Sequence, residues 1–276
     1  MNAIQTVMDN LIERQKMTSH SDVHICPHCG QEVPPMEIEV LGRKRWVQPI
    51  CECEKQAKME EINRLVRAKE ENEVRELFSI SNIGDKYLNA SFENFEVRPG
   101  SENAYKIAKH YAEHFEEYGP ESIMIWGEPG NGKTHLAAAV HNHLTKHGKV
   151  VVFISMPELL NKIKATFNYN NKETEQQILK ALNICDLLII DDLGAEKTSD
   201  WVQETVFTII DGRYRRQKPI LATSNIRPAD LIDKIGNRAY DRILEMSQPI
   251  ENKATSYRRE IAKQRLSKFD EILRGE

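Results

Sequence analysis

Eight consecutive residues of this chain match the pattern G-x-x-x-x-G-K-[ST] in full: Gly127-Glu128-Pro129-Gly130-Asn131-Gly132-Lys133-Thr134. The match lies between a short apolar run, 123–126, and a helix-forming stretch that begins at His135. Glycines at this spacing let backbone N–H groups close around phosphates, while the lysine neutralises phosphate charge and the threonine hydroxyl can ligate Mg²⁺. The sequence therefore predicts a strand, a phosphate-binding loop and a helix, with ATP or GTP bound by residues 127–135.

Four short apolar runs alternate with stretches of helical periodicity from about residue 104 onward. The runs occupy 122–126, 150–155, 186–190 and 219–224. Runs of this length between amphipathic helices predict parallel strands that are covered on both faces. In such a sheet ligands bind beyond the carboxyl ends of the strands, which is where the phosphate loop falls. The sequence therefore predicts an α/β fold.

Polar residues follow two of the later runs. One run leads into Asp191 and Asp192, and another is followed by Asn225. A carboxylate at a strand end beside a phosphate loop suits a Mg²⁺ contact, so we assign Asp191 to the metal together with Thr134. Either Asp192 or Glu196 would orient the attacking water, and adjacency favours Asp192. Asn225 would hydrogen-bond the γ-phosphate or that water.

Four of the five cysteines form two close pairs, C-x-x-C and C-x-C, near the N-terminus. They are Cys26, Cys29, Cys51 and Cys53. Zinc favours tetrahedral thiolate coordination, and a segment of about 50 residues with few large apolar side chains has little else to fold around. The pairs therefore predict a Cys₄ zinc site, in which His24 or His28 could replace one sulfur; redox thiols are the alternative. Cys185 stands apart in an apolar stretch and is expected to be a small buried side chain.

Length and composition describe an ordinary globular chain. It has 276 residues, 29% of them charged, and a net charge of −4. No apolar run reaches the roughly 18–20 residues of a bilayer span, and the first residues lack the basic and apolar regions of a secretory signal. We therefore expect a cytoplasmic protein without membrane contact.

Composition divides the chain into three segments. An amphipathic helical pattern within 1–22 precedes the cysteine pairs. Residues 54–77 are rich in Glu, Lys and Arg and contain no Gly or Pro, which predicts a long, mostly solvated helix. We expect a zinc module at 1–53, a charged helical linker at 54–84 and a nucleotide-binding domain at 85–276.

Six motifs follow one another along the nucleotide-binding domain, at 87–92, 127–134, 189–194, 223–225, 238–243 and 256–258. In this order they resemble the AAA+ ATPase domain of bacterial replicative helicase loaders of the DnaC/DnaI type, over about residues 85–265. The cysteine segment and charged helix resemble the zinc-bearing N-terminal region of DnaI-like and phage-encoded loaders. For the fold, the resemblance implies a five-stranded parallel sheet of order 5-1-4-3-2 flanked by helices.

The resemblance also implies roles for three arginines. Arg242 would be an arginine finger that reaches the ATP of a neighbouring subunit, with Arg238 as a second basic contact, and Arg258 would touch the γ-phosphate in its own subunit. A finger supplied by a neighbour implies a ring or spiral oligomer. Asp192 stands where most AAA+ proteins have the longer Glu, so hydrolysis is expected to be slow. The implied catalytic set is Lys133, Asp191, Asp192, Asn225, Arg242 and Arg258.

Loaders of this family bind a hexameric replicative helicase and deliver it onto single-stranded DNA. The zinc module is the candidate for gripping the helicase, although the basic cluster 43–45 beside Trp46 leaves a DNA role open. Single-stranded DNA binding needs positive charge with aromatic faces for stacking. Phe167 could instead belong to the core. The candidate DNA contacts are Lys162, Lys164, Phe167 and Tyr169.

Two other functions stay open at this point. A transposition-regulating ATPase of the IstB type would have nearly the same core but usually lacks a zinc segment. A zinc-dependent adaptor or helicase inhibitor would bind ATP with little hydrolysis, which Asp192 allows. An adaptor would need only the residues that bind nucleotide, so the presence of Arg242 and Arg258 beside them favours hydrolysis.

Overall fold

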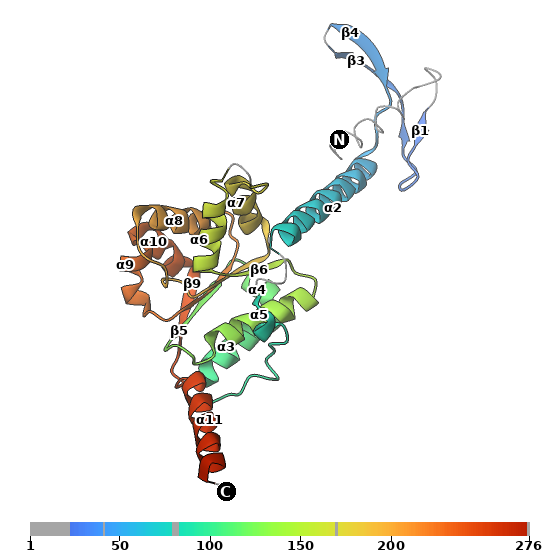
Figure 1. Ribbon diagram of the computed structural model, residues 1–276. Coiled ribbons are helices and arrows are strands. Elements are labelled where there is room, and N and C mark those ends of the chain that lie inside the picture. Colours follow the sequence, from blue (N-terminus) through green and yellow to red (C-terminus); the bar gives the residue numbers. More distant parts are fainter. Residues whose placement is uncertain (1–22, 41, 79–82, 169–170, 275–276) are drawn as a thin grey trace. The chain divides into compact units, whose positions relative to one another are not determined.

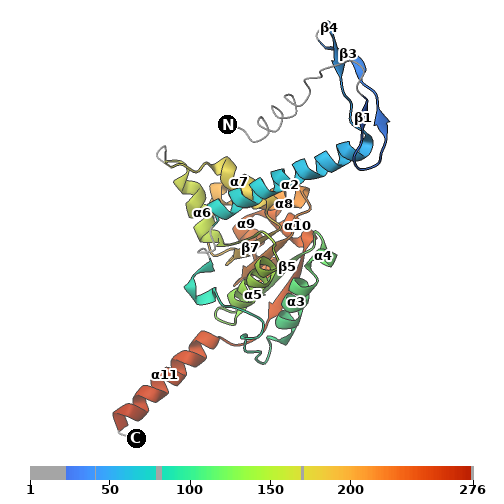
Figure 2. The same cartoon turned by 90° about the vertical axis from the view of Figure 1, so that its right-hand side faces the viewer.

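The computed structural model describes residues 23–40, 42–78, 83–168 and 171–274. The helical pattern within 1–22 and the candidate DNA contact Tyr169 lie outside the described residues. The chain forms two compact units, Met1–Lys69 and Glu70–Glu276 (Figures 1 and 2). The boundary between the units falls within a long helix, α2 (Glu52–Leu77).

In its described residues, the smaller unit contains two short antiparallel hairpins and the first turns of α2. β1 (His24–Ile25) pairs with β2 (Glu32–Val33), and β3 (Met36–Val40) pairs with β4 (Arg43–Val47). Among its described residues, the buried apolar cluster consists of Cys26, Val33 and Cys51, with Cys53 packed against it. Three side chains of this size cannot stabilise a unit by burial alone, so the cysteines form the centre around which it folds.

The last turns of α2 belong to the larger unit. Val74 and the following Phe78 are buried in its core. Glu73 forms an ion pair of 2.8 Å with Lys180 on α7 (Glu175–Ile184). The end of the charged helix is therefore attached to the nucleotide-binding unit by apolar burial as well as by charge.

The larger unit is built on a five-stranded sheet in which every neighbouring pair is parallel. The strands are β5 (Ser122–Gly127), β6 (Val151–Ser155), β7 (Leu187–Asp191), β8 (Ile220–Ser224) and β9 (Ser247–Asn252). Their order across the sheet is β6-β7-β8-β5-β9. Numbered from one to five along the chain, this is the order 5-1-4-3-2, so the predicted α/β fold and sheet order are confirmed.

Helices cover both faces of this sheet (Figures 1 and 2). Ile189 of β7 packs in the layer of α3 (Glu102–Glu113) and α5 (Lys133–Lys146), whereas the adjacent Ile190 packs in the opposite layer. Strands buried on both sides are apolar throughout, which explains the uninterrupted runs in the sequence. The opposite layer contains α6 (Met156–Ala165), α7, α8 (Asp200–Arg215) and α10 (Asn237–Met246).

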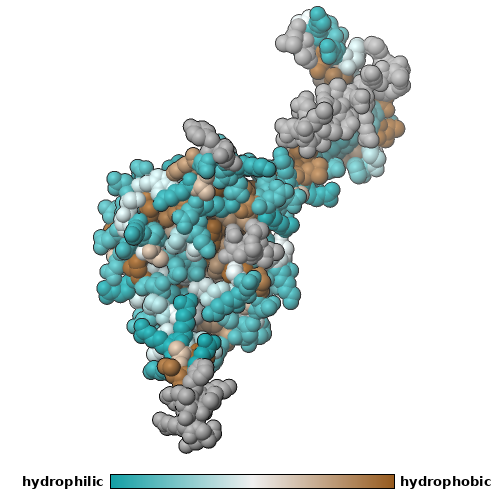
Figure 3. Space-filling view, viewed as in Figure 1, coloured by the Kyte–Doolittle hydropathy of each residue, from teal (hydrophilic) through white to brown (hydrophobic). Residues whose placement is uncertain are grey.

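The remaining elements are η2 (Asp85–Tyr87), α4 (Phe115–Tyr118), η3 (Pro228–Asp230), α9 (Ile232–Ile235) and α11 (Tyr257–Arg274). The face of the larger unit seen in Figure 3 is mostly hydrophilic. None of the helices in the described part of the chain has both the length and the apolar composition of a membrane span.

Candidate nucleotide-binding site

The loop between β5 and α5 turns sharply at its glycines. Gly130 has φ 83° and Gly132 has φ 104°, left-handed values that residues with side chains rarely adopt. Space is limited as well: a Cβ on Gly132 would lie 2.8 Å from Cε2 of Phe95, and one on Gly130 would collide with the Ser256 hydroxyl. Both positions therefore require glycine. Because neither glycine carries a side chain, the loop backbone can come close to a ligand.

Reciprocal hydrogen bonds hold this loop against β9. Asn131 Nδ2 donates to the carbonyl of Asn252 at 2.7 Å, and Asn252 Nδ2 donates to the carbonyl of Asn131 at 3.1 Å. Both residues are buried. The backbone N–H of Tyr257 donates to the carbonyl of Gly130 at 2.8 Å. The phosphate loop is thus tied to the segment that leads into α11.

Lys133 is the first residue of α5, and its ammonium group lies within the loop. Nζ donates to the carbonyls of Gly127 at 2.9 Å and Glu128 at 2.8 Å, and to Oδ1 of Asn131 at 3.1 Å. Burial lowers the pKa of Lys133 to about 8, while two nearby carboxylates act in the opposite direction. A buried cation at the N-terminus of a helix is well placed to neutralise a bound phosphate group.

Asp191, the last residue of β7, lies beside Thr134. Its Oδ1 accepts a hydrogen bond of 2.6 Å from the Thr223 hydroxyl, and the Thr134 hydroxyl bonds the same carboxylate. Burial raises the pKa of Asp191, and these two hydrogen bonds oppose that rise. A carboxylate and a hydroxyl side by side are oxygen ligands of the kind that Mg²⁺ prefers, so this pair fits the metal.

The two candidates for orienting water differ in position. Asp192 adopts φ 55°, and its Oδ1 accepts a hydrogen bond of 2.9 Å from Asn225 Nδ2; both residues line the cavity described below. Glu196 does not line it. Its carboxylate is buried and accepts the N–H of Gly194 at 3.2 Å, and burial raises its pKa. Only Asp192 is therefore next to the space where a nucleotide would bind.

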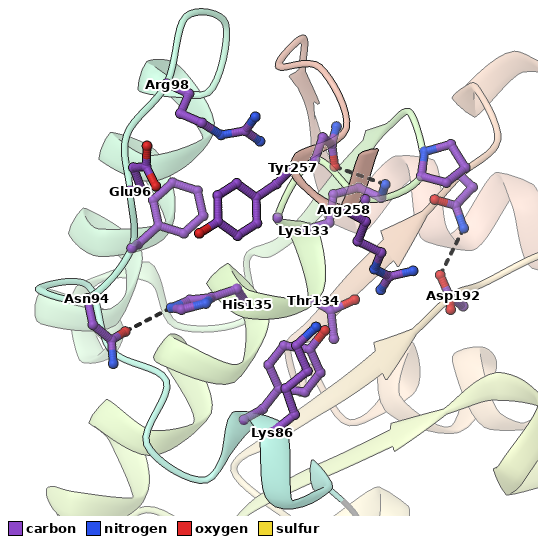
Figure 4. Close-up of a pocket in the computed structure, with 17 residues that line it drawn as sticks. Lys86, Asn94, Glu96, Arg98, Lys133, Thr134, His135, Asp192, Tyr257 and Arg258 are labelled. Atoms are coloured by element: carbon purple, nitrogen blue, oxygen red, sulfur yellow. Dashed lines mark hydrogen bonds between the residues drawn. The ribbon is translucent and has the colours of Figure 1, made fainter. Parts of the chain in front are cut away.

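A cavity of about 300 Å³ lies over the phosphate loop (Figure 4). Its wall includes residues 129–135, Asp192 and Asn225 from the strand ends, and Arg258 from α11. In Figure 4 the Arg258 side chain reaches toward Thr134 and Asp192. Tertiary structure thus gathers residues of four predicted motifs that are far apart in the sequence, 127–134, 189–194, 223–225 and 256–258, around one space large enough for a small-molecule ligand.

Seven residues of the wall were not among the predicted site residues: Lys86, Tyr87, Asn94, Phe95, Glu96, Arg98 and Tyr257. Six of them come from the segment that precedes α3. His135 Nε2 lies 2.9 Å from Asn94 Oδ1, and the rings of His135 and Phe95 meet edge to face at 5.4 Å (Figure 4). The predicted domain boundary at residue 85 marks where this segment starts, but no local pattern shows that it folds over the phosphate loop.

The two arginines of α10 do not line this cavity. The Arg242 guanidinium lies 4.5 Å from the centre of the Tyr214 ring, and its Nε donates to Asp211 Oδ1 at 3.3 Å. Arg238 lies 3.8 Å from the centre of the Phe207 ring. Both guanidinium groups therefore lie on α8 of their own chain rather than in its nucleotide cavity.

The four predicted cysteine ligands come together in the smaller unit. Their sulfur atoms all lie within 4.8 Å of one another, and they are Cys26, Cys29, Cys51 and Cys53. His24 Nε2 instead bonds Glu54 Oε2 at 2.9 Å, and His28 is not part of the group. A backbone hydrogen bond from Cys29, followed by one from the Cys51 side chain, lowers the pKa of Cys26 to about 6. Four converging sulfurs fit a tetrahedral zinc ion.

The described candidate DNA contacts differ in their surroundings. Phe167 is 57% exposed and meets the Trp201 ring edge to face at 6.1 Å, and Lys164 Nζ lies 4.8 Å from the centre of that Trp201 ring. Lys162 is paired with Glu173 at 2.6 Å. Phe167 is thus a surface residue rather than a core residue. Trp201, on the first turn of α8, completes an aromatic pair that sequence spacing did not reveal.

The sheet order, the phosphate loop after β5, the acidic pair after β7 and the polar end of β8 together define an ATP-binding P-loop ATPase domain of the AAA+ class. Residues 53–265 match the family described as IstB-like ATP binding protein, and the chain belongs to this family. The match begins at Cys53, so three of the four clustered cysteines lie outside it.

Several individual relatives are described as replication proteins. The chain is 32% identical over 180 residues to the replicative helicase loader DnaC of Buchnera aphidicola subsp. Schizaphis graminum, covering 65% of this chain and 73% of that protein. A crystal structure of the DnaC helicase loader matches with a TM-score of 0.56 and 26% identity, over 62% of this chain and all of that one. The replication initiator DnaA bound to AMPPCP and single-stranded DNA matches with a TM-score of 0.54 and 27% identity, over 68% and 56% of the two chains. The predicted relationship to DnaC-type loaders is therefore confirmed.

Proposed function

We propose that this protein is an ATP-dependent loader that binds a hexameric replicative DNA helicase in the cytoplasm and delivers it onto single-stranded DNA. The observation that carries the proposal is the cavity over the phosphate loop, lined by Lys133, Asp192 and Arg258, in a chain that matches 73% of the length of a DnaC helicase loader. ATP binding and slow hydrolysis serve as the switch. An IstB-type role in transposition is the second candidate, because the matching family carries that name.

Each part of the site has a task in this scheme. Lys133 neutralises the β and γ phosphates, and Thr134 and Asp191 hold Mg²⁺, which draws charge from the phosphate oxygens when it is bound. Asp192 orients the attacking water. The Asn225 amide fixes the Asp192 carboxylate through their 2.9 Å hydrogen bond. Because an aspartate is one carbon shorter than a glutamate, hydrolysis is slow and the bound ATP persists as a signal.

Assembly completes the site. Arg242 belongs to α10, and its guanidinium group packs against Tyr214 of α8, outside the nucleotide cavity of its own chain. We therefore assign it to the ATP of a neighbouring copy, with Arg238 as a second contact. Arginine suits this task because its planar guanidinium stays charged and makes two bonds to phosphate. Hydrolysis, although slow, then depends on assembly into a ring or spiral on the helicase.

The zinc module, residues 1–53, is our candidate for gripping the helicase. Zinc bound by Cys26, Cys29, Cys51 and Cys53 would fix two chain segments that have little apolar surface to pack. The helical linker, 54–84, joins this module to the ATPase domain, 85–276. The DNA contact lies on the ATPase domain, where Phe167 and Trp201 offer stacking faces and Lys164 offers charge for a phosphate.

The direct test is to mix the full-length protein with the replicative helicase of its host, with and without ATP, and to measure complex mass by light scattering on a sizing column. We expect a complex that is lost in the Cys26→Ser/Cys29→Ser variant and kept in His28→Ala, which changes the same turn without removing a sulfur. Absence of a complex with wild-type protein under both conditions would overturn the loader function and favour the transposition ATPase.

Steady-state ATPase rates with single-stranded DNA distinguish a loader from an adaptor. Wild-type protein on the helicase should hydrolyse ATP faster than Lys133→Ala and Arg242→Ala. Mixing Lys133→Ala with Arg242→Ala should recover part of the activity that each variant lacks alone, because the first supplies an intact finger and the second an intact phosphate loop. Equal background rates in all three proteins would mean that the bound nucleotide is not hydrolysed usefully.

A further inference from the structure

The first turn of α11 is held in part by the Tyr257 N–H, which donates to the Gly130 carbonyl at 2.8 Å, and by the Thr255 hydroxyl, which donates to Glu260 Oε1 at 2.6 Å. Figures 1 and 2 show the rest of this helix running away from the sheet and its covering helices. Arg258 lies on this turn and lines the nucleotide cavity. Where its guanidinium group lies therefore depends on what holds the residues immediately around it.

One side chain contacts residues on both sides of Arg258. Arg98 Nη1 donates to Glu260 Oε1 at 3.0 Å, and Nη2 donates to the carbonyl of Thr255 at 3.0 Å. Its guanidinium group also lies 5.1 Å from the centre of the Tyr257 ring. The Arg98 side chain is only 11% exposed, whereas its partner Glu260 is 43% exposed.

Arg98 is itself held rigidly. The hydroxyl of Ser101 accepts the N–H of Arg98 and donates to its carbonyl, both at 2.8 Å, and Ser101 is fully buried. Two residues further on, the carbonyl of Gly100 accepts the N–H of Lys253 at 2.9 Å. The start of α3 and the end of β9 thus form a fixed base from which the Arg98 guanidinium reaches α11.

The same segment also lines the cavity. Asn94, Phe95 and Arg98 all contribute to its wall, and Phe95 closes against Gly132 of the phosphate loop. In Figure 4 Arg98 lies on the Tyr257 side of the cavity and Asn94 beside His135. The segment that would contact the nucleotide is therefore the segment that orients α11.

We infer that Arg98 is a positioning residue: by holding Thr255 and Glu260, it sets the first turn of α11 so that Arg258 meets the γ-phosphate. The inference rests on the role proposed above for Arg258. The inference extends the role of Arg258, because discrimination between ATP and ADP then also depends on Arg98, which need not touch the γ-phosphate itself. Loss of Arg98 lets α11 turn, and Arg258 loses a contact that only ATP can make.

The test is to measure the affinity of full-length protein for fluorescent ATP and ADP analogues. Losing a charge-assisted bond to phosphate should weaken ATP binding by Arg258→Ala about tenfold, with ADP binding nearly unchanged. Arg98→Ala should reproduce most of this selective loss, and the double variant should be no worse than Arg258→Ala alone. Arg227→Ala, which breaks an exposed 2.8 Å ion pair with Asp230 away from the cavity, is the control.

Two further variants separate positioning from general damage. Glu260→Gln breaks the same ion pair from its more exposed side and should shift the ATP to ADP ratio in the same direction as Arg98→Ala. The exchange Arg98→Glu with Glu260→Arg should restore part of the ratio. Equal weakening of ATP and ADP binding in Arg98→Ala, or additive losses in the double variant, would overturn the inference.

The outcome is independent of the helicase experiment. If Arg258→Ala leaves the ratio of affinities unchanged, the roles of both Arg258 and Arg98 are wrong, even where the complex with the helicase forms. If Arg258→Ala changes the ratio and Arg98→Ala and Glu260→Gln do not, only the positioning role of Arg98 is wrong.

Discussion

Replacing Thr223 by valine removes one hydroxyl and keeps the shape of a fully buried side chain on β8. That hydroxyl donates to Asp191 Oδ1 at 2.6 Å and accepts the N–H of Asp192 at 3.0 Å. Thr223→Val therefore leaves a buried carboxylate with one donor fewer and a backbone N–H without its acceptor. Neither group can turn to water without disturbing the ends of β7 and β8.

The cost follows from these two losses. A hydrogen bond to a charged group contributes about 1.5–3 kcal/mol, and a buried polar group left without a partner costs roughly 1–3 kcal/mol. The extra methyl group returns about 1 kcal/mol of apolar burial. We expect Thr223→Val to lower the free energy of unfolding by about 3 kcal/mol at pH 7.

The loss should depend on pH because burial raises the pKa of Asp191. When the pKa is higher in the folded state than in the unfolded state, the folded state holds a proton that the unfolded state has released, so stability falls as pH rises between the two values. Removing the Thr223 donor raises the folded-state pKa further and extends this range upward. The difference between variant and wild type is therefore largest near pH 7 and smaller below the ordinary carboxyl range, where both proteins hold the proton.

Urea denaturation at pH 7 and about pH 4, followed by circular dichroism, measures this difference. Thr208→Val is the matched control, since its exposed hydroxyl bonds only the Glu204 carbonyl within α8, at 2.8 Å, and should change stability by less than about 0.5 kcal/mol. A loss in Thr223→Val no larger than in the control, or a loss of equal size at both pH values, would refute the reasoning.

Three other outcomes can be checked directly. Burial lowers the pKa of Lys133 to about 8, so above that pH the unfolded state binds more protons than the folded state. The free energy of unfolding of the wild type should therefore rise as pH rises toward 10. Lys133→Met should lack this rise in urea titrations. Removing zinc with a chelator should expose residues 23–53 to protease while fluorescent ATP still binds, and loss of both together would contradict a separate zinc module. Trp201→Ala should weaken single-stranded DNA binding about tenfold in fluorescence anisotropy, whereas Trp46→Ala should not.

Spacing along the chain was sufficient for the phosphate loop, four of the five strands and the cysteine cluster. Each of these features depends on residues that lie only a few positions apart in the sequence. Glycines permit the turn of the phosphate loop, apolar runs fill both faces of the sheet, and paired cysteines lie on tight turns. β9 is different. It is an edge strand with the sequence Ser-Gln-Pro-Ile-Glu-Asn. Three of its residues are buried, Ser247, Ile250 and Asn252, and only Ile250 among them is apolar, so the sequence shows no apolar run and no alternation here. Its place was implied by the family resemblance alone.

Tertiary structure decided which side chains meet when they are far apart in the sequence. It brought Asp192 rather than Glu196 to the cavity, put Trp201 beside Phe167, and laid the segment before α3 over the phosphate loop. The contact of Arg98 with Glu260 spans 162 positions of sequence. Such contacts follow from how whole layers pack, because a side chain near residue 98 meets α11 only after the sheet has formed and β9 has joined its edge.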